Sequence, residues 1–204
     1  MQKDMFKISS YQNRIPSAPD FRDFAIDCST AQWDDGPPVP LETIGRLSGL
    51  FWDAGFLPDK HDKWDLSTFD QRDGHAEEAA SVMISQRRLI EEVLTDSNLL
   101  FDGRAFLLLE RVFVKPERRG KRLALRLMRE AQHVFGRYGL LVMAKAHPDG
   151  LDISSEQISK LADYYTSDEQ LGFTHLSQAR FPGWIVAHWH SPQAADGDDF
   201  YWEP

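Results

Sequence analysis

The spacing of apolar residues predicts only a few regular elements in the first half of the chain. Apolar and polar residues alternate over 21–28, which favours a strand. Apolar residues at 41, 44, 47, 50, 51 and 54 form a helical stripe, which predicts a helix ending at Gly55. The prolines of 34–40 predict a rigid loop, and 63–69 carries a weaker strand pattern. Residues 1–20 show no clean period, so we expect them to be poorly ordered or to lie across the surface.

The second half of the chain has stronger periodicities. Residues 75–94 predict an amphipathic helix, followed by a strand over 105–114, a helix over 120–138 and a nearly unbroken apolar strand over 140–146. A helix over 154–168, capped by Ser154 or Ser155, precedes strands over 173–178 and 184–190 and an acidic, aromatic tail over 191–204. This alternation of strands and helices predicts an α/β protein with one domain over 1–204.

A basic turn joins the strand that ends at Val114 to the helix that follows it. Pro116 ends the strand, and Gly120 lies among lysines and arginines just before the helix. Such a turn directs several backbone N–H groups at one point, at the positive end of the helix dipole. It therefore makes a seat for phosphate or pyrophosphate. A solvated basic helix start is the alternative interpretation of this turn taken alone.

The sequence of the turn resembles motif A of the GCN5-related N-acetyltransferase (GNAT) superfamily. Motif A has the pattern Arg/Gln-x-x-Gly-x-Gly/Ala and holds the pyrophosphate of acyl-CoA. Arg119, Gly120 and Ala124 fit this pattern, and Val114 and Pro116 precede it as in the family. The family's glycine at the fourth position is Arg122 here. An arginine there alters the approach of the phosphates, or points outward and adds a charge-assisted contact to them.

A second element resembles the same superfamily. Family members carry a helix ending in Tyr-x-x-x-Gly-Phe, whose tyrosine lies near the thiol of the departing CoA. This chain has Tyr164 and Tyr165 followed by Gly172 and Phe173, with a spacing three residues longer than usual. A purely packing role for tyrosines on an amphipathic helix is the alternative. The resemblance covers residues 104–190 and does not extend to the first hundred residues.

The resemblance implies a fold and a cosubstrate. The fold is a mixed, mostly antiparallel sheet flanked by helices, with a central splayed pair of strands that end at Val114 and Ala146. The cosubstrate is acetyl-CoA, with 104–190 as its binding core and 21–103 as the variable half on the acceptor side. The residues implied in binding it are Val112, Phe113, Val114, Arg119, Gly120, Lys121, Arg122, Leu123 and Ala124.

Acetyl transfer to an amine requires a base for the amine, a donor to the thioester oxygen and an acid for the thiolate. The backbone N–H groups of 112–114 are the donors that the resemblance implies. Glu110 shares a strand face with Val112 and Val114 and is our candidate base, directly or through water, with His147 as its rival. Tyr165 is the candidate acid, with Tyr164 behind it.

Other reactive side chains favour structural roles. His188 and His190 share a face of the last strand, but no third metal ligand accompanies them, so we predict no metal site. Cys28 is the single cysteine, which excludes an internal disulfide and favours a small buried residue.

Composition limits the class of protein. A net charge of −9 disfavours a nucleic-acid-binding surface, whereas the cationic residues gathered in 111–129 suit an anionic cosubstrate. The sequence contains no apolar run near the roughly 20 residues that span a bilayer and no apolar signal core, so we expect a cytoplasmic protein without a membrane contact.

The leading function hypothesis is therefore an acyl-CoA-dependent N-acyltransferase, acting on a primary amine of a small molecule or a protein in a direct ternary complex. The acidic composition weakly favours a cationic acceptor. The alternative is a non-catalytic module that binds acyl-CoA or a partner protein. Acetylation of charged tRNA is a third hypothesis, which the net charge disfavours, and a homodimer remains open.

Overall fold

The computed structural model describes residues 2–11, 21–32, 39–53, 74–86, 90, 105–136, 140–150 and 152–189. Its strands are β1 (Gln2–Tyr11), β2 (Phe21–Gln32), β3 (Val39–Asp53), β4 (Ala105–Val114), β5 (Leu140–Lys145), β6 (Thr174–His175) and β7 (Trp184–Trp189). Its α-helices are α1 (Gly74–Ser85), α3 (Leu123–Phe135) and α4 (Ser155–Thr166), and a short 3-10 turn, η2, covers Pro116–Arg118.

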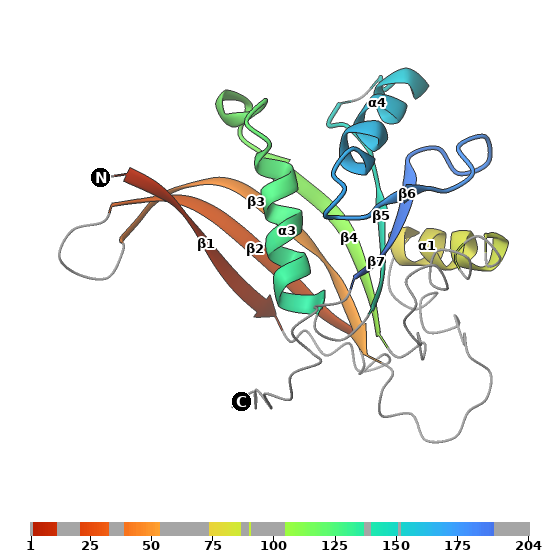
Figure 1. Ribbon diagram of the computed structural model, residues 1–204, viewed down its shortest axis with the longest axis horizontal. Coiled ribbons are helices and arrows are strands. Elements are labelled where there is room, and N and C mark those ends of the chain that lie inside the picture. The colour runs from red at the N-terminus through yellow and green to blue at the C-terminus, as the bar shows by residue number, and fades with distance from the viewer. Residues whose placement is uncertain are drawn as a thin grey trace.

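The strands described form one seven-stranded sheet in the order β1-β2-β3-β4-β5-β7-β6 (Figure 1). Every neighbouring pair is antiparallel except β4 and β5, which run parallel at the centre. The predicted mixed, mostly antiparallel α/β architecture is therefore confirmed. None of the helices described is long and apolar enough to cross a membrane.

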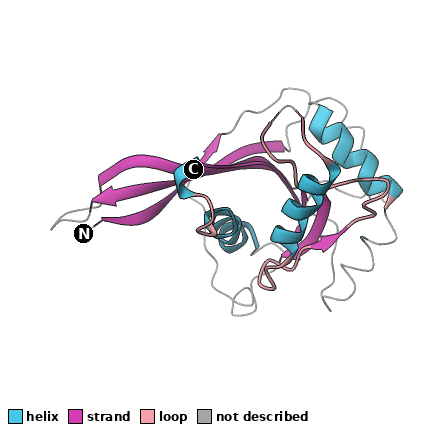
Figure 2. Cartoon of the chain, turned by 90° about the horizontal axis from the view of Figure 1, so that it is seen from above, coloured by secondary structure: helices cyan, strands magenta, loops and turns pink. Residues whose placement is uncertain are grey.

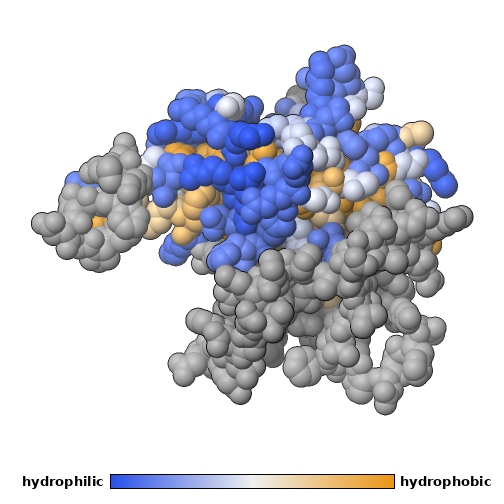
Figure 3. All heavy atoms as spheres, in the orientation of Figure 1, coloured by the Kyte–Doolittle hydropathy of each residue, from blue (hydrophilic) through white to orange (hydrophobic). Residues whose placement is uncertain are grey.

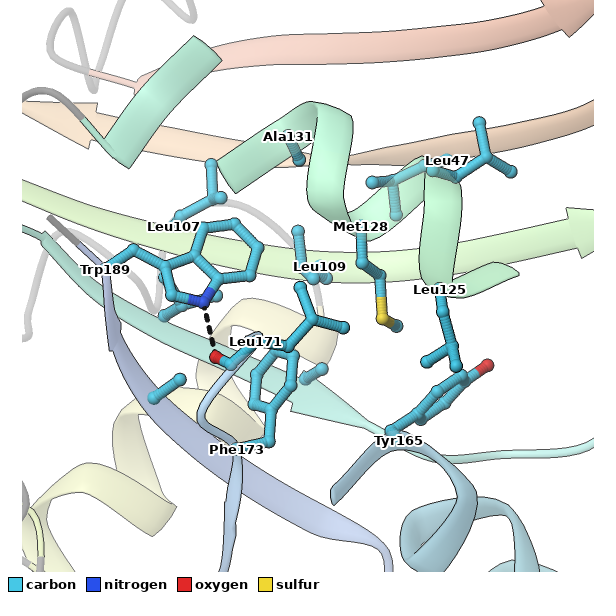
Figure 4. Packing of buried hydrophobic residues seen from close by; sticks show 14 of the residues in the cluster. Leu47, Leu107, Leu109, Leu125, Met128, Ala131, Tyr165, Leu171, Phe173 and Trp189 are labelled. Atoms are coloured by element: carbon cyan, nitrogen blue, oxygen red, sulfur yellow. Dashed lines mark hydrogen bonds between the residues drawn. The ribbon is translucent and has the colours of Figure 1, made fainter. Parts of the chain in front are cut away.

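Helices cover both faces of the curved sheet (Figure 2). On one face, α3 and α4 bury Leu127, Met128 and Ala162 against the sheet. On the other face, α1 buries Val82 and Met83. Trp189 belongs to the core beneath α3 and α4, and its indole N–H donates to the Leu171 carbonyl at 2.9 Å (Figure 4). The two cores keep the central strands buried from both sides, which fixes β4 and β5 as a rigid base.

The helix predicted over 41–54 is wrong, because Val39–Asp53 is the long strand β3. β3 lies between β2 and β4, and register shifts interrupt both ladders. Leu47 and Phe51 reach the core under α3, while Leu50 and Trp52 reach the core under α1, as the alternation of a strand requires. Ile44 departs from this alternation, because the ladder with β2 skips it, and it joins Leu47 in the core under α3. Apolar residues that serve two faces in this way imitate a helical stripe.

The N-terminal segment also differs from expectation, since Gln2–Tyr11 is the edge strand β1 and pairs with β2 along its whole length. Phe6 packs against the core, whereas Asp4 and Lys7 are exposed. An edge strand with one solvated face and few apolar residues gives a weak pattern. Residues 12–20 lie outside the described residues.

The remaining elements follow the predictions with shifted ends. α1 confirms the first part of the predicted 75–94 helix, and Ile90 is again helical. The predicted loop over 34–40 is wrong at Val39 and Pro40, which open β3. The predicted 173–178 strand shrinks to Thr174–His175. The predicted strand over 63–69, the tail over 191–204 and His190 lie outside the described residues.

Two helix starts show how local chemistry sets these ends. The Ser154 hydroxyl oxygen caps α4 by accepting a hydrogen bond from the Gln157 backbone N–H at 3.2 Å. In return, the side-chain oxygen of Gln157 accepts from the Ser154 backbone N–H at 2.8 Å. The helix predicted from Gly120 starts only at Leu123, because Gly120 (φ 75°) and Arg122 (φ 56°) have left-handed conformations that a helix does not allow.

Candidate functional site

The parallel pair β4 and β5 separates half-way along its length. Its ladder runs from Phe106 opposite Leu141 to Leu109 opposite Ala144 and includes no later residue of β4. β5 instead stays with β7, since Lys145 pairs with Trp184 and the Ala146 N–H donates to the Gly183 carbonyl at 2.8 Å. A Cβ on Gly183 would lie 2.5 Å from the Ala146 oxygen, so only glycine permits this approach. The result is a gap between the ends of β4 and β5.

The backbone of Val112 and Val114 faces this gap. The Lys115 N–H donates to Ile44 on β3 at 3.0 Å, so the N–H groups of alternate residues before it also point toward β3. Phe113 is one of these, paired with Arg46, whereas Val112 and Val114 point the other way. The Val114 carbonyl confirms this direction, because it accepts from Nε of Arg119 at 3.2 Å.

Glu110 is the extra residue of a β-bulge. Ser48 pairs with Arg111 and Gly49 pairs with Leu109, so nothing on β3 is opposite Glu110. A bulge bends the strand and redirects its side chains. It begins where the ladder with β5 ends, so Glu110 lies at the start of the gap.

In the basic turn before α3, Gly120 and Arg122 have left-handed backbone conformations. Arg122 is the N-cap residue of α3, and its side chain makes no capping hydrogen bond. The first intrahelical bond runs from the Arg126 N–H to the Arg122 carbonyl at 3.1 Å. The N–H groups of Leu123, Ala124 and Leu125 precede that bond and have no intrahelical acceptor. Because they lie at the positive end of the helix dipole, they can bind an anion.

Arg119 bridges the two lips of the gap. Its Nε holds the end of β4, and its Nη2 lies 3.2 Å from a carboxylate oxygen of Asp149, in the loop after β5. Both side chains of this ion pair are about half exposed (54% each), so it contributes roughly 1 kcal/mol or less to stability. Arg119 thus links the end of β4 to the loop after β5 across the gap.

The tyrosine pair comes from the last turn of α4. Tyr165 is 7% exposed, and burial raises the pKa of its hydroxyl far above the usual value. Tyr164 is half-buried, and burial also raises the pKa of its hydroxyl. The two ring centroids are 5.5 Å apart. Both phenols therefore stay protonated near neutral pH, as a proton donor must.

The loop after α4 explains why the spacing between Tyr165 and Gly172 is long. The buried carboxylate of Asp168 lies 2.6 Å from Nη2 of Arg129 on α3, and its other oxygen accepts from the Leu171 N–H at 3.4 Å. The additional residues therefore form a turn that ties α4 to α3, and the helix itself still ends at Thr166.

These elements surround a cavity of about 520 Å³ on the α3 and α4 side of the sheet. In the space-filling view, hydrophilic residues cover the turn and the outer end of α4, and apolar surface is visible between α3 and α4 (Figure 3). Most of the residues predicted from the sequence line this cavity: Glu110, Val112, Val114, Arg119, Gly120, Arg122, Leu123, Ala124, Tyr164, Tyr165 and the rival base His147. Phe113, paired to β3, and the exposed Lys121 are not among its lining residues. Sequence reasoning did not find Arg111, Lys145 and Asp149, which line it as well.

A second cavity of about 580 Å³ adjoins the first. It is lined by Ser48 of β3, His75 of α1, Glu110, Arg111, Lys145, His147 and Asp149, the last five of which it shares with the first cavity. Ser48 and His75 belong to the α1 side of the molecule, and α3 and α4 lie on the opposite face of the sheet. The two cavities therefore meet at the gap between β4 and β5.

The other reactive side chains lie elsewhere. Cys28 is fully buried, as predicted, and burial raises the pKa of its thiol to about 11. His188 is half-buried on β7. Within the part of the chain that the structure describes, no group of three or more potential ligands could hold a metal ion.

Comparison with known proteins gives a narrow result. No family model and no curated protein matches the sequence. Among solved structures, a KacTA–DNA complex matches with a TM-score of 0.35 and 11% identity over 82% of this chain and 67% of that one. A tyrosine-to-phenylalanine mutant of KacT matches with the same score and identity over 87% of this chain and 75% of that one. Similarities this weak show nothing about the activity of this protein.

Proposed function

We propose that this protein is an acyl-CoA-dependent N-acyltransferase, with acetyl-CoA as donor and a primary amine as acceptor. The observation that carries the proposal is one cavity enclosed by the strand gap, the left-handed turn before α3 and the tyrosine pair of α4. These are the three elements that the resemblance to the GNAT superfamily requires, and they come from separate stretches of the chain.

Each wall of the cavity suits one part of an acyl-CoA. The N–H groups at the start of α3, together with Arg122, would hold the pyrophosphate. The backbone of Val112 and Val114 would pair with the amides of the pantetheine arm, as a strand pairs with a sheet edge. A flexible, anionic, partly peptide-like ligand therefore finds complementary groups along the whole cavity.

The chemistry then uses residues at the inner end of the cavity. Glu110, directly or through water, would take a proton from the amine as its nitrogen attacks the thioester carbon. A backbone N–H of β4 would donate to the thioester oxygen as charge develops there. As the carbon–sulfur bond breaks, Tyr165 would give its proton to the departing thiolate.

A second candidate function is binding without turnover. Arg122 at the family's glycine position and the long turn after α4 favour it. The two functions differ in one respect: an enzyme releases free CoA thiol when an amine is present, and a binding module does not.

The test combines acetyl-CoA binding with thiol release. Calorimetry or thermal unfolding should show binding, with stabilisation of about 2.7 kcal/mol at a hundred times the dissociation constant. A panel of primary amines should then release thiol from acetyl-CoA, measured with an aromatic disulfide reagent. The buried Cys28, with its raised pKa, should contribute little to that signal. Binding without release from any amine favours the binding module, and absence of binding rejects both functions.

A further inference from the structure

The second cavity does not share the acidic balance of the protein. The whole chain carries a net charge of −9, whereas in this cavity Arg111 and Lys145 balance Glu110 and Asp149. His75 belongs to the first turn of α1, so the positive end of that helix dipole also lies at the cavity wall. That dipole favours an anionic group at this wall.

Lys145 and Asp149 form ion pairs with residues outside this cavity. Nζ of Lys145 lies 2.6 Å from a carboxylate oxygen of Glu78, and Asp149 pairs with Arg119. In the part of the chain that the structure describes, the Arg111 guanidinium forms no ion pair and no hydrogen bond. Arg111 is thus a cation in the cavity wall that is available to a ligand.

A hydroxyl accompanies Arg111. Ser48 on β3 is its cross-strand partner, so the two side chains lie on the same face of the sheet, and both line the second cavity. A guanidinium beside a hydroxyl provides several donors to the two oxygens of one carboxylate. Glu110, the neighbour of Arg111, lines both cavities and is the candidate base.

We infer that the acceptor is a small molecule with a carboxylate as well as its primary amine, and that Ser48 and Arg111 bind this carboxylate. This inference rests on the proposed function. The amine would lie at Glu110, where the two cavities meet, and the carboxylate would lie toward Ser48. A cavity of about 580 Å³ is of the size that holds small ligands. Arg111 in the wall of this cavity thus favours an anionic group on the acceptor, in contrast to the cationic acceptor that the acidic composition favoured.

The test compares amines that differ only in the anionic group. The pairs are β-alanine with ethylamine and L-leucine with isoamylamine, and aminoethylphosphonate serves as the phosphate-like arm. Thiol release from acetyl-CoA by the full chain gives kcat/KM for each amine. The variants are Arg111→Gln and Ser48→Ala, with Arg22→Gln as control, since Arg22 is an exposed arginine of β2 outside both cavities.

We expect the wild type to have a higher kcat/KM for the amino carboxylates than for the simple amines. Arg111→Gln should lower kcat/KM for the amino carboxylates by about 10- to 100-fold more than for the simple amines, mainly through KM. Ser48→Ala should act in the same direction by less, and Arg22→Gln should change nothing. A preference for simple amines, or an equal loss for all amines in Arg111→Gln, overturns the inference. A preference for the phosphonate would support an anion-binding site at Arg111 and would contradict the assignment of a carboxylate as its ligand.

Direct binding separates this inference from the proposed function. Saturation-transfer NMR of β-alanine and L-leucine with the wild type and Arg111→Gln needs no turnover. If the chain transfers no acetyl group but binds an amino carboxylate through Arg111, the proposed function fails and the site remains. If Arg111→Gln loses acetyl-CoA affinity and still binds both amino acids as tightly as the wild type, Arg111 serves the first cavity and the inference fails. If neither amino acid binds and neither is acetylated, the inference is also wrong.

Discussion

The ammonium of Lys145 lies 2.6 and 2.9 Å from the two carboxylate oxygens of Glu78, and the indole N–H of Trp184 donates to the same carboxylate at 3.2 Å. Burial by itself would raise the pKa of the Glu78 carboxyl. The hydrogen bonds from Lys145 and Trp184 outweigh that effect and hold this pKa below its usual value. Glu78 thus ties α1 to β5 and β7 and fixes Lys145 between the two cavities.

Glu78→Gln should destabilise the fold by about 1–2 kcal/mol at neutral pH, because Lys145 loses its charged partner. The folded pKa of Glu78 is lowered, so its contribution exists above the unfolded value of 4.5 and is lost as the pH falls below it. Urea unfolding should therefore show a difference from the wild type that shrinks toward about pH 3. Glu77→Gln, on the exposed side of α1, is the control and should have little effect. A difference that stays constant with pH would contradict this reading.

Asp168→Asn should destabilise the protein by about 1–3 kcal/mol, since the buried carboxylate (2% exposed) pairs with Arg129. Because that pair holds the turn after α4 to α3, acetyl-CoA affinity should fall as well. Thermal unfolding and calorimetry measure the two effects. Asp163→Asn is the matched control, because Asp163 pairs with His175 at an exposed position and should lose under about 1 kcal/mol. Equal losses in both variants would show that burial of Asp168 is unimportant.

Arg122→Gly should stabilise the protein by up to about 1 kcal/mol, because Arg122 has a φ of 56°, which costs a residue with a Cβ more than it costs glycine. Acetyl-CoA affinity should stay within about tenfold. Arg118→Gly is the control, since Arg118 lies in η2, outside the left-handed region, and should lose stability. A much larger loss of affinity in Arg122→Gly would identify Arg122 as a principal phosphate ligand.

Gly120→Ala tests whether a ligand occupies the space above the turn. A Cβ on Gly120 would meet no protein atom within 4 Å, so its cost of about 1 kcal/mol comes from the φ of 75° alone. Gly172→Ala is a matched control, with φ of 64°, equally open space and a position outside the first cavity. We expect similar losses of stability in unfolding experiments, but a loss of acetyl-CoA affinity only in Gly120→Ala. Equal affinities in the two variants would reject the phosphate seat.

Tyr165→Phe should lower the acetyl-transfer rate by about 100-fold or more and leave acetyl-CoA affinity nearly unchanged. Burial raises the pKa of Tyr165, so the hydroxyl stays protonated at pH values well above the usual tyrosine pKa. Tyr165 should therefore cause no fall in rate between about pH 7 and 9, and its contribution to stability should be lost only above about pH 10. Tyr164→Phe is the matched variant. If it loses more rate than Tyr165→Phe, the half-buried Tyr164 is the acid.

The sequence by itself determined the parts of this protein whose chemistry is local. Pro116 and Gly120 define the turn before α3, Ser154 and Gln157 cap α4, and the apolar run over 140–146 predicts a buried strand. Each of these features depends on neighbours only a few residues away. Together with the resemblance to the GNAT superfamily, they predict most of the residues that line the first cavity.

Only the tertiary structure decided which distant strands meet and where their ladders shift. β3 imitates a helix because its apolar residues are buried on both faces of the sheet, and the bulge that places Glu110 exists only through the pairing of β4 with β3. The pairing of Ser48 with Arg111 and the tie from Glu78 to Lys145 likewise join residues far apart in the chain. Such contacts depend on sheet register, which one sequence does not reveal because it is set by the simultaneous burial of two faces.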